Sequence, residues 1–193
     1  YDEAFDALDK AEAVARKHKM VRERAEIYHI RGNLYFPMGR IEECAVEHEK
    51  SLKFARESGS VEAEANSLSG LGDASYVAGR MDTAFRYFGR CVEVASENGL
   101  GWIEIVNSSM AGFSRIYLNQ LREALEIGLN TIEAANKVGH QRAEMLGEIL
   151  AATVLFEMAD YPNARQHNSQ AIELARQLGA PRFEAQGLLY EGK

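Results

Sequence analysis

The stretch GLGDAS at residues 70–75 is where residue types first suggest chemistry, because glycine-rich loops of this kind cradle the phosphates of dinucleotides. Such a cradle follows a β-strand, whereas both glycines here fall inside a predicted helix, and Gly72 recurs at a fixed spacing along the chain. We therefore interpret Gly70 and Gly72 as packing positions. The segment has no GxxxxGK[ST] phosphate-binding loop, so any ATPase activity would need residues outside it.

The histidines and carboxylates do not form a recognisable catalytic or metal-binding motif. There is no HExxH motif, no cluster of Cys with His, and no Ser, His and acidic residue arranged as a triad. Glutamates near predicted helix starts, such as Glu42 and Glu43, are favourably placed in the helix dipole. We predict that the segment is not an enzyme and binds no metal or cofactor. His48 is expected to pack between helices, because the equivalent positions hold Phe88 and Gly128.

The composition describes a soluble protein with an acidic balance. The 193 residues carry a net charge of −7, which argues against sequence-independent binding of nucleic acid. Cys44 and Cys91 are expected to be buried small hydrophobic residues, and this favours a reducing compartment, the cytoplasm. The longest apolar run, residues 149–156, is too short to cross a membrane. We predict no membrane and no nucleic-acid partner.

A pattern that returns every 40 residues organises the whole chain. A fixed period of this length is typical of stacked structural repeats. Alanine and glycine recur at two positions of the unit. Small residues recur at two more, the Gly32 and Cys44 positions, and these should let paired helices pack closely. The recurring positions are Ala55, Ala95, Ala135 and Ala175; Gly59, Gly99, Gly139 and Gly179; Gly32, Gly72, Gly112 and Ala152; and Cys44, Ala84, Ala124 and Ala164.

Each unit is predicted to be a pair of antiparallel helices joined by short turns, and the fold class is therefore all-α. The first helix of the pair, helix A, is expected at 21–38, 61–78, 101–118 and 141–158. Helix B is expected at 41–58, 81–98, 121–138 and 161–178. Pro37 should fray or kink the last turn of its helix. We expect one domain over 1–193, with a partial repeat 1–20, repeats 21–60, 61–100, 101–140 and 141–180, and a partial repeat 181–193, as a fragment of a larger protein.

With these residues aligned, the unit resembles the tetratricopeptide repeat (TPR). The match is carried by Tyr28, Gly32, Tyr35, Gly39, Cys44 and Leu52 in one copy and by Leu68, Leu71, Gly72, Gly79, Ala84, Phe88 and Cys91 in the next. The resemblance implies a right-handed superhelical solenoid. The period of 40 exceeds the family's usual 34. Such longer units are similar to the repeats of bacterial adenylate-cyclase-type and ATPase signalling proteins, and eukaryotic scaffolds with 40-residue repeats are also similar.

In TPR arrays, helix A lines a concave groove that binds a peptide or protein segment. The resemblance implies an exposed groove with apolar anchors and amide donors. The family's carboxylate-binding clamp is only partly echoed, by Asn33 and Arg142. The groove residues carried over are His29, Asn33, Phe36, Asn66, Asp73, Tyr76, Trp102, Val106, Ser109, Phe113, Tyr117, Arg142, Leu146, Ile149 and Thr153.

The favoured function is a non-catalytic protein-interaction module in a larger, bacterial signalling or regulatory protein. The alternatives are a sensor domain for a small ligand or peptide, and a structural spacer. Trp102, Phe113 and Arg142 are the predicted binding hot spot, because Trp and Arg often carry interface energy and sister copies hold charged residues at position 102. For each apolar groove residue, packing in the core remains the competing interpretation. The terminal helices could also mediate a homodimer.

Overall fold

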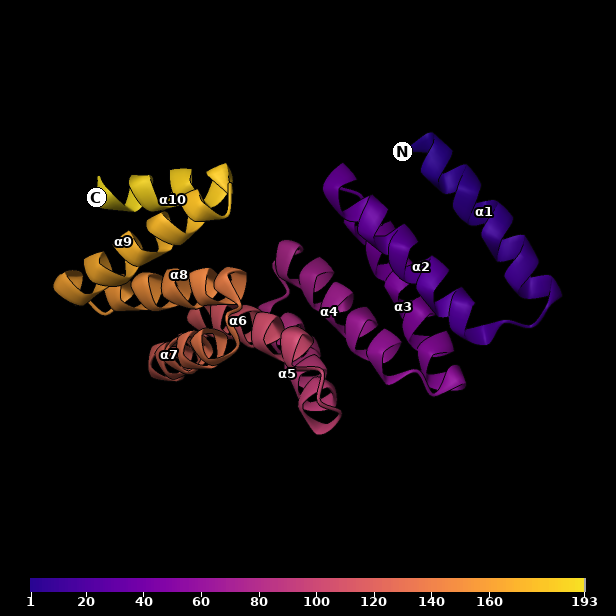
Figure 1. Ribbon diagram of the computed structural model, residues 1–193, viewed down its shortest axis with the longest axis horizontal. Coiled ribbons are helices and arrows are strands. Elements are labelled where there is room, and N and C mark those ends of the chain that lie inside the picture. Colours follow the sequence, from indigo (N-terminus) through magenta and orange to yellow (C-terminus); the bar gives the residue numbers. More distant parts are fainter. Residues whose placement is uncertain (193) are drawn as a thin grey trace. The chain divides into compact units, whose positions relative to one another are not determined.

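The computed structural model describes residues 1–192, and within them it contains ten α-helices, one short 3₁₀ helix and no strand (Figure 1). The all-α prediction is confirmed, and each predicted helix is found with its ends within a few residues. The helices are α1 (Asp2–Lys17), α2 (Val21–Tyr35), α3 (Ile41–Ser58), α4 (Val61–Val77), α5 (Met81–Glu97), α6 (Gly101–Tyr117), α7 (Leu121–Val138), α8 (Gln141–Glu157), α9 (Tyr161–Gln177) and α10 (Pro181–Glu191), with the 3₁₀ helix η1 at Phe36–Met38.

The chain forms two compact units, Tyr1–Glu104 and Ile105–Lys193. Within each unit, consecutive helices pack against each other, and in the first unit α2 also contacts α4, the next helix A. Pro37 changes the last turn after α2 from α-helix to 3₁₀ helix, as predicted, because proline removes a backbone donor.

The turns between helices depend on a residue in the left-handed backbone region. Gly59 and Gly139 cap helix B with φ of 68° and 69°, as the recurring glycines predict. The turns that follow helix A use the same conformation. Gly39 and Gly79 occupy it in the first unit, whereas Asn119 and Ala159 occupy it in the second with φ of 58° and 61°.

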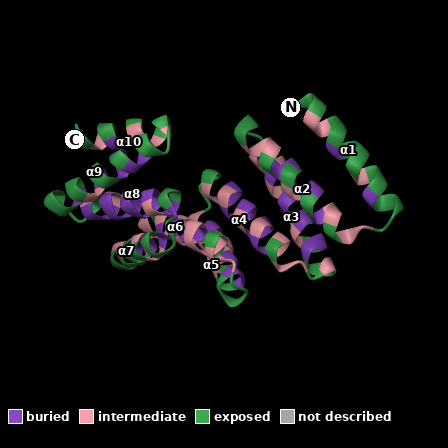
Figure 2. Ribbon diagram, viewed as in Figure 1, coloured by how far each residue is buried: buried purple, intermediate pink, exposed green. Residues whose placement is uncertain are grey.

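The core of the first unit is a series of small clusters between neighbouring helices (Figure 2). One repeated polar contact supports the 40-residue register. The Ser51 hydroxyl donates to the Ala25 carbonyl at 2.7 Å, and the Cys91 thiol makes the equivalent contact with the Ala65 carbonyl at 3.2 Å. Cys44 and Cys91 are both free and buried, as expected.

The recurring glycine of helix A makes room for one bulky side chain rather than for a helix backbone. A Cβ on Gly32 would lie 2.6 Å from the His48 ring, and a Cβ on Gly72 would lie 2.4 Å from the Phe88 ring. Gly70 also faces His48, at 2.3 Å, so both glycines of GLGDAS are packing positions, as predicted. The close approach of helices A and B that the sequence suggested is therefore mediated by a ring from helix B.

The second unit fills the equivalent space differently. There a Cβ on Gly112 would lie 2.3 Å from Leu150, which comes from the next helix A, α8. Leu150 is fully buried and packs with Ala124 and Val154. The bulky residue has moved from helix B to the following helix A, and Gly128 takes the place that Phe88 holds in the first unit.

A buried ion-pair network joins α1 to the rest of the first unit. Arg31 on α2 is 8% exposed and pairs with Glu12 and Asp9 on α1, each at 2.7 Å. Its guanidinium also lies 3.6 Å from the Glu47 carboxylate on α3. The Tyr28 hydroxyl donates to Glu12. One guanidinium therefore connects three consecutive helices, with only Leu8 and Ala15 of α1 buried beside it.

Candidate partner-binding surfaces

In the first unit, the predicted groove residues lie on α2 with η1 and on α4, two neighbouring A helices. None of them is fully buried, so their side chains reach the surface while resting on the core. They are His29, Asn33 and Phe36 on the first of these segments and Asn66, Asp73 and Tyr76 on the second. Asn33 and Asp73 are the same position of successive repeats, since they lie 40 residues apart.

Two imidazoles form the floor of this region. The His29 and His48 rings are tilted with centroids 5.3 Å apart, and His29 Nε2 lies 3.0 Å from the Asn33 side-chain amide. The Nδ1 atoms of both histidines are buried and have no hydrogen-bond partner in the described chain. His48 is 1% exposed and is held between Gly32 and Gly70.

Burial keeps both imidazoles neutral at physiological pH. It lowers the pKa of His29, and burial together with the neighbouring His29 lowers the pKa of His48 to about 3. The two rings therefore carry no positive charge at pH 7, and their buried Nδ1 atoms are not accessible from the surface.

Asp73 is a partly buried carboxylate whose charge is not compensated. It forms no hydrogen bond or ion pair with any described residue, and burial raises its pKa to about 6. Burial and the nearby Asp73 charge together raise the pKa of the Cys44 thiol to about 11. Because Asp73 is mostly ionised at pH 7, it presents an acceptor that a cation or an N–H donor can satisfy.

Trp102 is 66% exposed, as predicted from the charged residues in sister repeats. It lies in the first turn of α6 and belongs to the first unit. Phe113 and Arg142 belong to the second unit, so the three residues of the predicted hot spot are distributed over both units. Arg142 is exposed, whereas Phe113 packs against the cluster of Ala124, Leu150 and Val154.

Several predicted groove residues of the second unit belong to its interior. Ser109 is 0% exposed and Leu146 is 8% exposed, so neither lies on an open surface, contrary to the expectation. Val106 and Ile149 pack against the cluster that includes Met145 and Leu146. These apolar side chains stabilise the contact between α6, α8 and α9. Thr153 is half-buried and its hydroxyl donates to the Ile149 carbonyl, whereas Tyr117 is 65% exposed.

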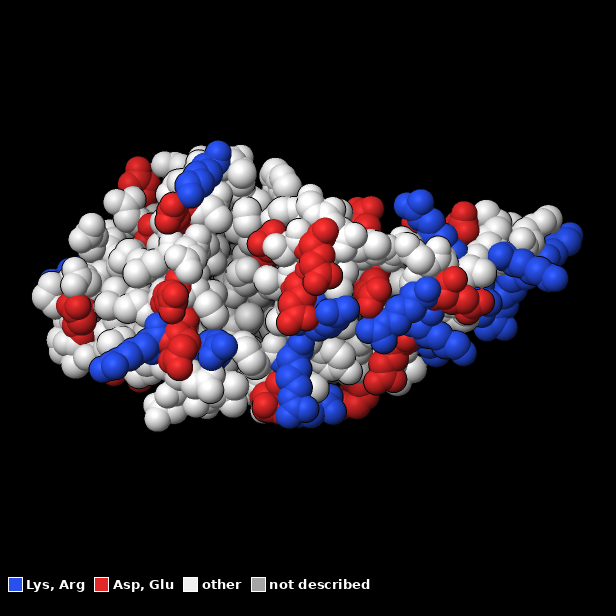
Figure 3. Space-filling model, turned by 90° about the horizontal axis from the view of Figure 1, so that it is seen from below, with Lys and Arg blue, Asp and Glu red and all other residues white. Residues whose placement is uncertain are grey.

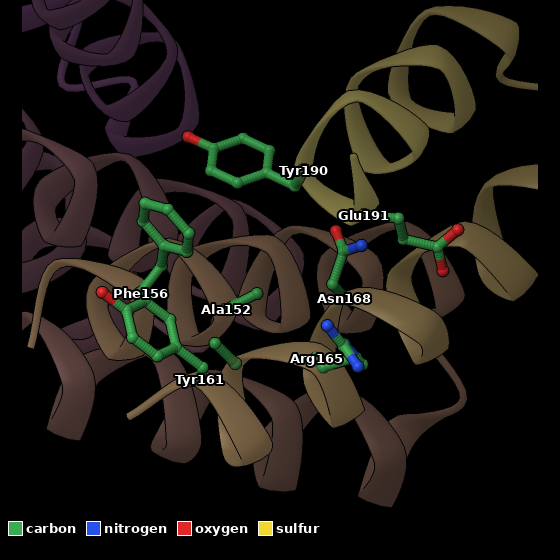
Figure 4. Close-up of a pocket in the computed structure, with 8 residues that line it drawn as sticks. Ala152, Phe156, Tyr161, Arg165, Asn168, Tyr190 and Glu191 are labelled. Atoms are coloured by element: carbon green, nitrogen blue, oxygen red, sulfur yellow. The ribbon is translucent and has the colours of Figure 1, made fainter. Parts of the chain in front are cut away.

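A cleft between α8, α9 and α10 was not predicted from the sequence. It is lined by Ala152, Phe156, Tyr161, Ala164, Arg165, Asn168, Tyr190 and Glu191 (Figure 4). The available signal was the fourth copy's departure from the pattern, with Ala152 in the glycine position and Asn168 in the position of Phe88. Nothing in that departure alone distinguishes a cleft from a repacked core.

On the side shown in Figure 3, charged side chains of both signs are interspersed, so this side presents no large face of a single charge. On this side, Lys and Arg alternate with Asp and Glu over the first unit, and much of the second unit's surface is uncharged (Figure 3). The described helices include none that could span a membrane. The described residues also contain no group of three or more His, Cys, Asp or Glu side chains placed to hold a metal ion.

A scan of protein-family models and a search of curated proteins each found no match. Solved structures do match. The apo form of RapI has a TM-score of 0.87 at 15% identity, with 97% of this chain and 69% of that chain covered. A structure described as Podosopora anserina kinesin light chain nearly identical TPR-like repeats has a TM-score of 0.70 at 13% identity, covering 92% and 89% of the two chains.

A third match is the Pyrococcus horikoshii Signal Transduction ATPase with Numerous Domains, a protein with a tetratricopeptide repeat sensor. The TM-score is 0.64 at 17% identity, and the match covers 95% of this chain and 32% of that chain. At these identities the likeness concerns the fold. The fold is that of TPR-like helical repeat proteins, as the sequence pattern predicted.

Proposed function

We propose that this chain is a non-catalytic protein-interaction module that binds a peptide segment along the A helices of its first unit. The observation that carries the proposal is Asp73, a partly buried carboxylate with no partner in the described chain. Asn33 occupies the same position one repeat earlier and is exposed. An unpaired carboxylate suits the backbone N–H groups and basic side chains of an extended segment, and the exposed Asn33 amide can add hydrogen bonds.

The wider setting that we propose is a larger bacterial signalling or regulatory protein of the cytoplasm. Two observations support it. The units of 40 residues resemble the repeats of adenylate-cyclase-type and ATPase signalling proteins. The Pyrococcus horikoshii match is a signal transduction ATPase in which the matched part is 32% of the chain. In this setting the repeat module recognises a protein segment and another domain performs the response.

The proposal is tested by selecting peptides from a random library displayed on phage, with the full-length protein as bait. We expect enriched sequences to contain Lys or Arg. Asp73→Asn should weaken binding of a selected peptide about tenfold, because a hydrogen bond to a charged group contributes about 1.5–3 kcal/mol. Wild-type binding should also weaken as the pH falls through about 6, since Asp73 then becomes protonated.

Asp6→Asn is the matched control, because Asp6 is exposed on α1 and the substitution removes the same charge. Circular dichroism of each variant verifies that the helices remain. Selected peptides without basic residues, or equal binding to the Asp73→Asn and Asp6→Asn variants, would refute the role of Asp73. A library that yields no binder would refute the peptide-binding function.

A sensor of small ligands is the second candidate function, and the cleft in the second unit favours it.

A further inference from the structure

The cleft between α8, α9 and α10 has a volume of about 300 Å³ and lies entirely within the second unit. This volume is at the lower end of the range for small-molecule sites. The cleft lies beside Ala152, the fourth copy of the recurring small residue of helix A, where a bulky side chain fills the equivalent space in other repeats. His48 fills the space beside Gly32, and Leu150 fills the space beside Gly112. In the fourth copy the equivalent residues are Asn168 and Tyr190, and the space beside Ala152 stays open.

Aromatic side chains form one part of the cleft. The Phe156 ring meets Tyr161 and Tyr190 edge to face, with centroids 5.5 Å and 5.8 Å away. Figure 4 shows Phe156 and Tyr161 on one side of the cleft and Tyr190 above it. Tyr190 therefore packs on Phe156 and does not fill the space as Leu150 does. Edge-to-face aromatic groups of this kind receive a planar ring well.

The other side of the cleft is polar and incompletely paired. Asn168 is 8% exposed, and its Nδ2 donates to the Gly187 carbonyl at 3.0 Å. Its Oδ1 accepts no hydrogen bond from the described residues. This oxygen is not fully enclosed, so a ligand N–H can reach it and donate a hydrogen bond.

Arg165 supplies a positive charge at the same side. Its guanidinium forms no ion pair with any described residue, whereas Glu191 points away from the aromatic rings in Figure 4. The equivalent positions in the other repeats hold Ala45, Phe85 and Leu125, so the helix packing does not require a cation there. A guanidinium beside a mostly apolar cleft is well suited to a carboxylate.

We propose that this cleft binds a small carboxylic acid that carries an aromatic ring and an N–H group. The ring would lie against Phe156 and Tyr190, the carboxylate would pair with Arg165, and the N–H would donate to Asn168 Oδ1. The site is made by the second unit alone and does not depend on the peptide-binding surface of the first unit. Failure of either proposal therefore leaves the other unaffected.

The test is a calorimetric titration of the full-length protein with three compounds. N-acetyl-phenylalanine has the ring, the carboxylate and the N–H. N-acetyl-phenylalaninamide lacks only the carboxylate charge, and N-acetyl-alanine lacks only the ring. We expect N-acetyl-phenylalanine to bind at least fivefold more tightly than each of the other two. For the amide this is about the effect of one partly exposed ion pair, and for N-acetyl-alanine it reflects loss of the buried ring. Equal affinities, or no binding of N-acetyl-phenylalanine at 10 mM, would overturn the proposal.

Two substitutions then locate the site. Arg165→Gln should remove the preference for the acid over the amide, and because Arg165 is exposed the substitution leaves the core intact. Arg122→Gln removes an exposed arginine of the same unit and should leave both affinities unchanged. A preference for the acid that survives Arg165→Gln, or that is lost equally in Arg122→Gln, would also overturn the proposal. Circular dichroism melting of each variant shows that it is folded.

Discussion

In the first unit, the space between α2, α3 and α4 is filled by the imidazole of His48, whereas in the second unit the equivalent space between α6, α7 and α8 is filled by Leu150. The two residues come from different helices of the repeat. His48 needs glycine on both neighbouring A helices, at positions 32 and 70. Leu150 needs glycine on α6 and α7, at positions 112 and 128. The difference shows that one repeat geometry accepts several packing solutions, provided that only one large side chain occupies the space.

The two solutions have different chemical properties. The imidazole brings buried nitrogen atoms and a titratable group into the first unit, next to a carboxylate with a raised pKa. The leucine brings only apolar contacts and should contribute more stability for its volume. We therefore expect the stability of the first unit to depend on pH through His48, and the stability of the second unit to depend on the volume of the Leu150 side chain.

The largest expected effect is in the second unit. Leu150→Ala should lower the free energy of unfolding by about 3 kcal/mol, because it removes a fully buried side chain and leaves a cavity between two glycines. Ile30 is the same repeat position in the first unit and is 47% exposed. Ile30→Ala should cost less than about 1 kcal/mol. Urea unfolding measures both, and equal losses would contradict the proposed difference between the units.

A smaller effect is expected from pH in the first unit. His48 has a folded pKa of about 3, below its ordinary value of 6.5, so the unfolded chain binds a proton more readily between these values. Its contribution to stability is therefore complete above pH 6.5 and is lost as the pH falls toward 3. His48→Phe places the residue of the sister repeat, Phe88, in the same space. Between pH 6.5 and 4.5, wild type should lose about 2 kcal/mol more than this variant.

The contribution of Asp73 to stability changes with pH in the opposite direction to that of His48. For this reason wild type is compared with His48→Phe, a variant that keeps Asp73. Its folded pKa of about 6 lies above its ordinary value of 3.8, so its contribution is complete below pH 3.8 and is lost as the pH rises through 6. Asp73 is present in both proteins and cancels when their unfolding free energies are subtracted. Parallel pH profiles for wild type and His48→Phe would show that His48 is not the group responsible.

The smallest effects concern the turn after helix A. Gly79→Ala should destabilise the first unit by about 1 kcal/mol, because its φ of 74° is unfavourable for a residue with Cβ. Ala159→Gly is the reverse change at the same repeat position of the second unit, where φ is 61°. It should stabilise by about 0.5 kcal/mol, because glycine's larger unfolded-state entropy offsets part of the gain. Thermal melting checks both signs, and a loss of stability in Ala159→Gly would contradict the strain assigned to that turn.

The helices and their order were predictable because a pattern repeated four times averages out local ambiguity. Gly59 and Gly139 marked helix ends that the structure confirms by their positive φ. The positive φ of Ala159 was not predictable from its type, since alanine rarely adopts it. Only alignment with Gly39 and Gly79 could have indicated this turn.

Side-chain placement was less predictable than backbone. Ser109 and Leu146 were assigned to an exposed groove by their repeat position, yet their neighbours bury them. Exposure of Trp102 was predictable because sister copies hold charged residues there. The cleft depends on three residues from three helices, Ala152, Asn168 and Tyr190, and their joint effect on volume is not visible in any one helix.

The differing fill of the same space also limits how the repeats can be rearranged. A deletion of residues 61–100 keeps the 40-residue register, but it replaces Gly70 with Met110 beside His48. A duplication of 21–60 would place Ile30 there instead. Either event puts a second large side chain where the His48 ring already leaves no room for a Cβ. The units are periodic in sequence but not interchangeable, so gain or loss of a whole repeat by recombination would require compensating changes at these junction positions.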